Sequence, residues 1–282
     1  MLTSRIADLP AETRARLVER LRTGSGARAT GRWFSPQHQL EHPGLRLFAF
    51  SYAGGGASVF RSWAKRLPPG VELWTAHLPG REQRSDEPPF LRMESLVDAL
   101  KASLEPHQDR PYAFFGHSMG ALVAFALTRR LRQANRPLPR HLFLAGFRAP
   151  QLPNPNIKIH HMPDEVIKTV LRKDGTPQAV LDDQELMDAF LPTLRADLEC
   201  CDTYRYTDEP PLDVPMSVFG GDQDVRVGRR DLEQWRSQTR AEFELAMFPG
   251  SHFFIHQCQD QLLSRIHTAI DSRTATRHES VS

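Results

Sequence analysis

Three short stretches of the sequence contain residues that could together do nucleophilic chemistry. The first, GHSMG (116–120), places Ser118 between two glycines, after the strand-like YAFF (112–115) and before the helix-like ALVAFALTRRL (121–131). A serine on a sharp turn from strand to helix projects its Oγ above the sheet, and the helix directs its first amide groups toward an oxyanion. This context predicts that Ser118 is a nucleophile rather than a helix cap.

The second and third stretches supply an acid and a base for this serine. FGGDQDVRV (219–227) carries Asp222 and Asp224 directly after a predicted strand, and His252 follows FPGS (248–251) after the last one. A serine nucleophile needs a histidine to take its proton and a carboxylate to orient that histidine. The chain order serine, aspartate, histidine is that of nucleophile-elbow hydrolases. We therefore predict His252 as the base and one of the two aspartates as the acid.

A glycine-rich loop, SYAGGG (51–56), follows the first strand of the predicted core. An oxyanion hole needs a second backbone donor from such a loop, and glycines let the backbone approach a substrate carbonyl. A phosphate-binding loop is the alternative. It is disfavoured because no lysine–serine or lysine–threonine pair follows and the G-x-G-x-x-G spacing is absent.

Apolar strand-like runs alternate with helical patterns from residue 45 onward, which predicts an α/β fold with a mostly parallel sheet flanked by helices. One interval, 150–215, has only helical patterns and is expected to form a lid over the carboxyl edge of the sheet, where ligands bind. The predicted strands are 45–52, 71–79, 111–118, 141–147, 215–221 and 243–250. The predicted helices are 57–67, 93–104, 119–132, 229–239 and 260–270, with 164–173, 183–190 and 193–204 in the lid.

Composition narrows the class of protein. The 282 residues are 40% hydrophobic and 25% charged, with a formal net charge of +2, which gives no support for a nucleic-acid or membrane partner. Three cysteines without a CxxC pattern, no signal-like N-terminus and no apolar run of 18 residues predict a cytoplasmic protein. A short helix at 10–22 and a flexible link at 23–31 make residues 1–40 an expected N-terminal extension.

Several stretches together resemble the type II thioesterases, discrete α/β-hydrolases that accompany polyketide synthases and non-ribosomal peptide synthetases. The resemblance covers about 45–270 and is carried by FSYAGGGASVFRSW, LPGREQR, GHSMGALVAFALTRRL, LRKDGTP, LPTLRADLE, FGGDQDVRV and FPGSHFFI. The family's D-x-x-V pattern selects Asp224 as the acid, although Val225 stands where a proline is usual. The resemblance also implies the backbone amides of Ala53 and Met119 as oxyanion donors.

The resemblance implies hydrolysis of acyl groups from the phosphopantetheine arm of acyl or peptidyl carrier proteins, by a monomer that needs no metal or other cofactor. The expected organisation is a catalytic domain at 41–272, with the lid at about 153–211, and a flexible tail at 273–282. Three alternatives stay open. They are a product-releasing thioesterase or cyclase, which a G-x-D-S carrier site before the domain would favour, a generic serine esterase, and a non-catalytic interaction protein.

Some residues support two interpretations each. Leu171, Phe190, Leu191 and Leu194 are candidates for acyl contact or for packing inside the lid. Arg81, Arg84 and Arg148 could meet an acidic carrier surface or be solvated. His117 is expected to pack against the sheet, His256 to be structural or on the surface, and the Cys200–Cys201 pair to be buried.

Overall fold

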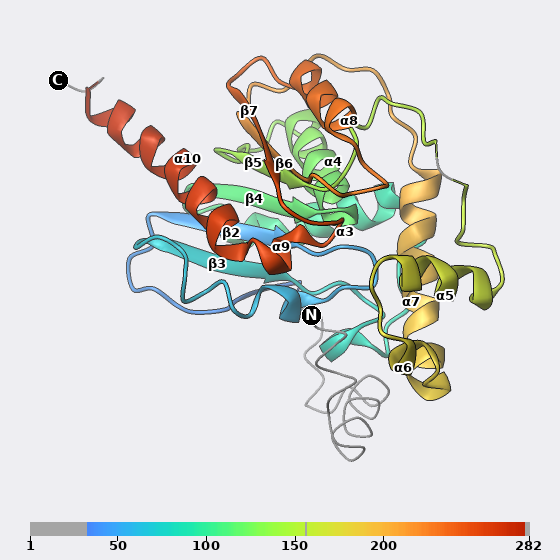
Figure 1. The fold of residues 1–282 in the computed structure, drawn as a ribbon. Helices are drawn as coiled ribbons and strands as arrows, with labels where there is room; N and C mark the ends of the chain where they lie inside the picture. The colour runs from blue at the N-terminus through green and yellow to red at the C-terminus, as the bar shows by residue number, and fades with distance from the viewer. Residues whose placement is uncertain (1–32, 156, 280–282) are drawn as a thin grey trace.

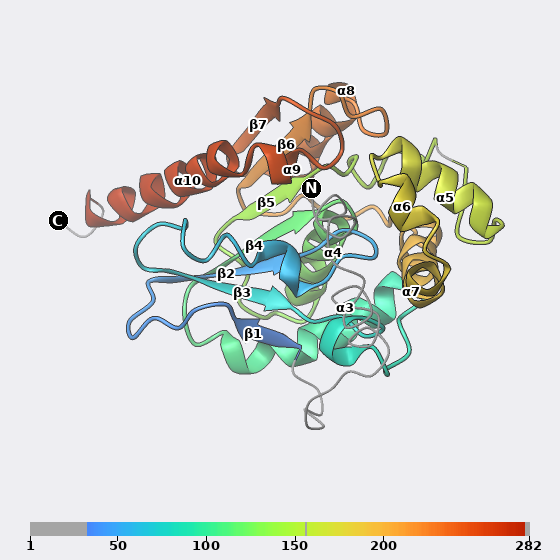
Figure 2. The ribbon, with the colours of Figure 1, turned by 60° about the horizontal axis from the view of Figure 1, so that its bottom comes forward.

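A seven-stranded sheet forms the centre of the computed structural model, which describes residues 33–155 and 157–279. The strand order is β1-β3-β2-β4-β5-β6-β7, and every neighbouring pair is parallel except β1 with β3 (Figure 1 for β2 to β7, Figure 2 for β1). The strands are β1 Phe34–Pro36, β2 Leu45–Phe50, β3 Val71–Ala76, β4 Tyr112–His117, β5 Leu142–Ala145, β6 Met216–Gly221 and β7 Phe243–Phe248. The predicted mostly parallel sheet and its six core strands are confirmed.

Helices cover both faces of the sheet, and each face has its own apolar core. One core joins the sheet to α3, α4 and the indole of Trp235 in η4, and the other joins it to η1, α9 and α10. The helices outside the lid are α3 Met93–Leu104, α4 Met119–Gln133, α8 Arg229–Glu233, α9 Phe254–Gln257 and α10 Gln259–Glu279. The 3₁₀ helices are η1 Ala57–Phe60, η2 Glu82–Arg84, η3 Glu105–His107 and η4 Gln234–Gln238.

The helical insertion between β5 and β6 is present as predicted. It contains α5 Asp164–Lys173, α6 Gln178–Leu181 and α7 Gln184–Thr203, which lie together beyond the carboxyl ends of the strands (Figure 2). The insertion has a small apolar core of its own, centred on Ile167, Met187 and Leu191. We call α5, α6 and α7 the lid.

Four predicted helices differ in the structure. The segment predicted as one helix at 229–239 is the short helix α8 followed by the 3₁₀ helix η4. The segment 57–67 forms only η1 and further turns closed by i to i+3 bonds, such as Trp63 N to Phe60 O, and its side chains Phe60 and Trp63 are buried in the apolar core against the sheet. The two helices predicted around Pro192 are one continuous helix, α7. A proline removes a single helical hydrogen bond, and the packing of Leu191 and Leu194 on either side keeps the axis intact.

Both ends of the predicted catalytic domain also differ. Strand β1 lies within the expected extension 1–40 and pairs with β3. Helix α10 continues to Glu279, into the expected tail. The helix predicted at 10–22 lies outside the described residues.

The three cysteines Cys200, Cys201 and Cys258 are all unpaired, and Cys200 is buried as predicted. Across the described part of the chain, no helix has the length and apolar character needed to cross a membrane.

Candidate active site

Ser118 occupies a strained turn between β4 and α4. Its backbone has φ 54° and ψ −120°, a region that a non-glycine residue adopts only when its surroundings impose it. The flanking glycines make the turn possible. A Cβ on Gly116 would lie 2.0 Å from the carbonyl oxygen of Gly120, and a Cβ on Gly120 would lie 2.1 Å from that of Phe50. Strand β4, helix α4 and strand β2 therefore approach closely at the serine.

The three side chains singled out by the sequence are brought together in one hydrogen-bonded chain. The Oγ of Ser118 lies 2.9 Å from Nε2 of His252, and Nδ1 of His252 lies 2.7 Å from Oδ2 of Asp224. The carboxylate can only accept, so Nδ1 carries a proton and Nε2 is left to accept the serine proton. This is the tautomer that a general base needs.

The structure also separates the two candidate acids. Asp224 has a side chain that is 1% exposed, and its Oδ1 accepts the amides of Arg226 and Val227 at 2.8 and 3.3 Å. Burial raises the pKa of Asp224, but the hydrogen bonds from His252 and the two amides outweigh burial and hold that pKa below its usual value. Asp222 is exposed and its Oδ1 instead accepts the amide of Gly250, which braces the loop after β7.

His117 holds the backbone of His252 in place through a hydrogen bond. It is fully buried, and its Nε2 donates to the carbonyl oxygen of His252 at 2.8 Å. Burial, together with the neighbouring His252, lowers the pKa of His117 well below its ordinary value, so the ring stays neutral. Gly146, with φ +62°, leaves room for this contact because a Cβ there would lie 3.0 Å from Nε2 of His117. His117 was expected to pack against the sheet, and in the structure it also forms a specific hydrogen bond to the backbone of His252.

His256 lies in α9 and is half-buried. Its Nε2 is 3.3 Å from the hydroxyl of Tyr52, and burial lowers the pKa of His256 to about 4. A neutral His256 accepts a hydrogen bond from the tyrosine hydroxyl, so this histidine is structural, as expected.

The glycine loop after β2 has three central amides, those of Ala53, Gly54 and Gly55, and two of them donate hydrogen bonds within the protein. The amide of Gly54 donates to Oδ2 of Asp197 at 2.7 Å, and the amide of Gly55 donates to the carbonyl oxygen of Tyr52 at 2.8 Å. Among the described residues, the Ala53 amide donates no hydrogen bond. The Met119 amide is the first of α4, and the first amides of a helix have no partner inside it.

Two of the three arginines, Arg81 and Arg84, are buried, so both interpretations offered for them, contact with a carrier surface and exposure to solvent, were wrong. Arg81 is 7% exposed and pairs with Asp197, and Arg84 is 7% exposed and pairs with Glu87 while lying over the ring of Trp33. Arg148 is half-buried, and its guanidinium lies over the ring of Phe147.

The acyl-contact candidates separate into two pairs. Leu191 and Leu194 are buried in the core of the lid, so they pack internally. Leu171 and Phe190 are only partly buried at the edge of that core. Within the described residues, no group of three or more histidine, cysteine or acidic side chains is placed to hold a metal ion.

Sequence reasoning missed two acidic residues of the lid that reach the site. Asp197 in α7 contacts the glycine loop, and Asp174 at the end of α5 forms an ion pair with Arg226, two residues after Asp224. Burial raises the pKa of Asp174, while Arg226 and His252 oppose that rise. Both aspartates fall in the motifs LPTLRADLE and LRKDGTP that carried the resemblance, but nothing in their spacing indicated a partner.

The parallel sheet order and the strained turn after β4 define an α/β-hydrolase. The chain belongs to the thioesterase domain family, which matches residues 45–270. This confirms the predicted family and identifies a hydrolase acting on thioesters.

Relatives of the chain come from biosynthetic pathways for peptide and polyketide products. The gramicidin S biosynthesis protein GrsT of Aneurinibacillus migulanus is 41% identical, over 82% of this chain and 91% of that protein. Among solved structures, the RedJ thioesterase of the prodiginine pathway in Streptomyces coelicolor is 38% identical, with a TM-score of 0.76, covering 82% of this chain and 89% of that one. The type II thioesterase YbtT of the yersiniabactin NRPS/PKS pathway is 28% identical with a TM-score of 0.75, covering 83% and 96%.

Proposed function

We propose that this protein hydrolyses acyl groups from the phosphopantetheine arm of acyl or peptidyl carrier proteins in a non-ribosomal peptide or polyketide pathway. Ser118 is the nucleophile, His252 the base and Asp224 the acid that orients it. The observation that carries the proposal is the hydrogen-bonded chain from Ser118 through His252 to Asp224, at the turn after β4. The relatives named above support the substrate class.

The reaction has two halves. His252 takes the proton of Ser118 while Oγ attacks the thioester carbonyl, and the amides of Ala53 and Met119 stabilise the resulting oxyanion. The tetrahedral intermediate collapses, and the pantetheine sulfur leaves with the proton from His252. His252 then removes a proton from water, which attacks the acyl-serine ester, and the carboxylic acid departs as Ser118 regains its proton.

The proposed setting is the cytoplasm, where the enzyme acts as a monomer. Three unpaired cysteines suit a reducing compartment. We further propose that the role is editing, in which stalled or wrong acyl groups are removed, rather than release of the finished product. The proposed catalytic domain is 41–272 with its lid at about 153–211, and strand β1 and the end of α10 extend it on either side.

Intact-protein mass spectrometry tests this function directly. An acyl-loaded carrier protein is incubated with wild-type enzyme, with the Ser118→Ala variant, and with no enzyme. The expected result is loss of the acyl mass with wild type alone, and a panel of short and long acyl groups then separates editing from release of one product. If no carrier loses its acyl group while a simple ester is cleaved in a Ser118-dependent way, the protein is a plain esterase.

A further inference from the structure

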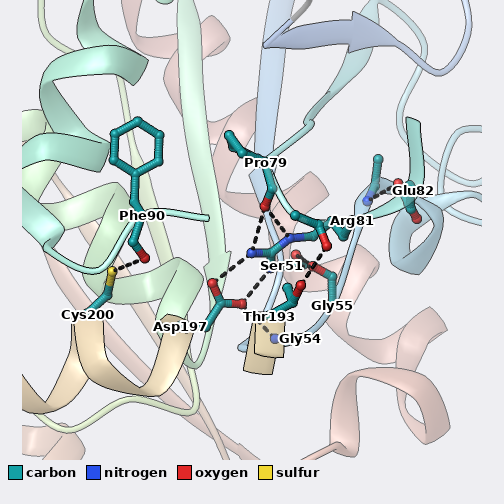
Figure 3. A network of polar contacts seen from close by, with 12 residues as sticks. Ser51, Gly54, Gly55, Pro79, Arg81, Glu82, Phe90, Thr193, Asp197 and Cys200 are labelled. Carbon is teal, nitrogen blue, oxygen red and sulfur yellow. Dashed lines mark hydrogen bonds and ion pairs between the residues drawn. The ribbon is translucent and has the colours of Figure 1, made fainter. Parts of the chain in front are cut away.

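One buried ion pair joins the lid to the glycine loop. Arg81 and Asp197 form two parallel bonds, Nη1 to Oδ2 at 2.5 Å and Nη2 to Oδ1 at 2.7 Å, and their side chains are 7% and 4% exposed (Figure 3). Arg81 follows β3 in the η2 turn, whereas Asp197 is on α7. The pair therefore connects two elements that are far apart in the sequence.

Both partners of this pair also hold the backbone of the loop. Oδ2 of Asp197 accepts the amide of Gly54 at 2.7 Å, and Nη1 of Arg81 donates to the carbonyl oxygen of Gly55 at 3.2 Å. The hydroxyl of Ser51 donates to the same carbonyl oxygen at 2.7 Å. The peptide groups directly after Ala53 are thus fixed from two sides.

Gly54 has φ +74°, and the amide of Gly55 bonds back to the carbonyl oxygen of Tyr52, so residues 52–55 form a type II turn. The turn directs the amide of Gly54 toward the lid and leaves the amide of Ala53 without an acceptor among the described residues. Asp197 therefore accepts the Gly54 amide and, by holding that part of the turn, sets the orientation of the Ala53 amide.

The contacts of α7 with the glycine loop and with the turn that carries Arg81 come from one face of the helix. Phe190, Thr193, Leu194 and Asp197 follow the spacing of a single helix face. A Cβ on Gly54 would lie 2.7 Å from the ring of Phe190, and the hydroxyl of Thr193 donates to the carbonyl oxygen of Gly80 at 2.5 Å. Figure 3 shows Asp197 and Thr193 meeting the turn that carries Arg81 and the loop at Gly54 and Gly55.

A buried ion pair contributes little net stability relative to an apolar pair of similar volume. Its occurrence at this loop is better explained by geometry than by stability. We propose that Asp197 and Arg81 are positioning residues, which hold the glycine loop so that the Ala53 amide points at the oxyanion. This inference rests on the proposed function, in which that amide stabilises the oxyanion.

The test compares full-length wild type with an Asp197→Asn variant and a matched control, Glu199→Gln. Glu199 is on the same helix and pairs with Arg92 of the core at 2.5 Å, without contacting the glycine loop. In Asp197→Asn, the amide NH₂ faces the guanidinium of Arg81 in either orientation, and in one of them it also faces the Gly54 amide, so a donor is opposed by a donor in both cases. A double variant, Arg81→Met with Asp197→Leu, removes both charges and leaves no unpaired ion in the interior.

Two readouts report on the oxyanion site. The first is kcat and KM on a short acyl thioester, and the second is the rate at which a fluorophosphonate labels Ser118, followed by intact mass. Loss of a single oxyanion donor costs roughly 10²–10³ in kcat. We expect misplacement of the donor to lower kcat and the labelling rate together by at least about tenfold, with KM within about twofold. Glu199→Gln should match wild type in both readouts.

Circular dichroism and a melting temperature establish that each variant is folded. The inference is overturned if a folded Asp197 variant keeps the wild-type labelling rate, if Glu199→Gln loses as much, or if neither variant with a changed Asp197 folds, because the pair then holds the fold itself. Failure of the proposed function looks different. In that case the wild-type enzyme would not cleave carrier thioesters, while the rate of Ser118 labelling would still be lower in the Asp197 variants than in wild type.

Discussion

Replacing Asp224 with asparagine should disable the base while leaving the fold intact. Oδ1 of Asp224 accepts two backbone amides, from Arg226 and Val227, so in the variant the amide oxygen must stay at that position. The NH₂ group then takes the place of Oδ2 and faces Nδ1 of His252, 2.7 Å away in the wild type. Because NH₂ only donates, His252 must present a lone pair at Nδ1 and move its proton to Nε2.

The size of the effect follows from that tautomer. With the proton on Nε2, His252 donates toward Ser118 and cannot accept its proton. In the serine protease template, the same change of carboxylate to amide lowers kcat by about 10⁴. A factor of ~10⁴ corresponds to about 5 kcal/mol of lost transition-state stabilisation. We therefore expect kcat of Asp224→Asn to fall by roughly three to four orders of magnitude.

Asp222→Asn is the matched control because it makes the same chemical change two residues away. Its amide oxygen can still accept the amide of Gly250, so kcat should stay within about twofold of wild type. Both variants are assayed on acyl-loaded carrier protein and on a short acyl thioester, at enzyme concentrations high enough to detect a ~10⁴-fold loss. Asp224→Asn with more than a tenth of wild-type kcat would refute the tautomer argument, and so would an equal loss in Asp222→Asn.

Three further predictions concern packing and charge. Gly120→Ala places a Cβ 2.1 Å from the carbonyl oxygen of Phe50. Chemical denaturation should therefore show a free energy of unfolding that is lower by about 1–3 kcal/mol or more, and an unchanged value would contradict the close approach. Burial raises the pKa of Glu209, but bonds from Arg129 and Arg132 outweigh it and lower that pKa. A lowered carboxyl pKa means that ionised Glu209 stabilises the fold above its unfolded pKa, and that this contribution is lost as the pH falls through the folded pKa. In urea titrations, Glu209→Gln should therefore be about 1 kcal/mol less stable than wild type at pH 7, and the difference should shrink as the pH is lowered into the acid range. Burial raises the pKa of Asp174 against the effect of Arg226. Arg226→Gln leaves the Asp174 carboxylate without its ion-pair partner, so at pH 8 a protease should cleave the segment around α5 faster than in wild type, and this excess should shrink as the pH is lowered. An excess over wild type that does not change with pH would refute a role for the Asp174 charge.

The gathering of the three candidate side chains could be predicted because they follow one after another at strand ends. Ser118 lies directly after β4, and Asp224 and His252 lie shortly after β6 and β7. Parallel strands bring their carboxyl ends to one edge, so residues placed there in the sequence must gather in space. Local pattern and topology therefore suffice for these three residues.

Contacts between the lid and the core could not be predicted in the same way. LPGREQR showed charged residues that a surface loop would carry, yet Arg81 and Arg84 are each only 7% exposed. The acidic partner of Arg81 is Asp197, 116 residues away, and no periodic pattern relates the two positions. Similarly, β1 is three residues long and contains Pro36, so its sequence has no strand signal of its own. Its place in the sheet depends on pairing with β3.

The lid consists of two parts that are attached differently to the core. Helix α7 bonds to core loops through Thr193, Asp197 and Cys200, one after another along its length. The end of α5 reaches the loop of the proposed acid, Asp224, through the pair of Asp174 with Arg226. Moving α7 would take the acceptor from the Gly54 amide and misplace the Ala53 amide. A lid movement that keeps the bond from the Gly54 amide to Asp197 therefore leaves α7 in place.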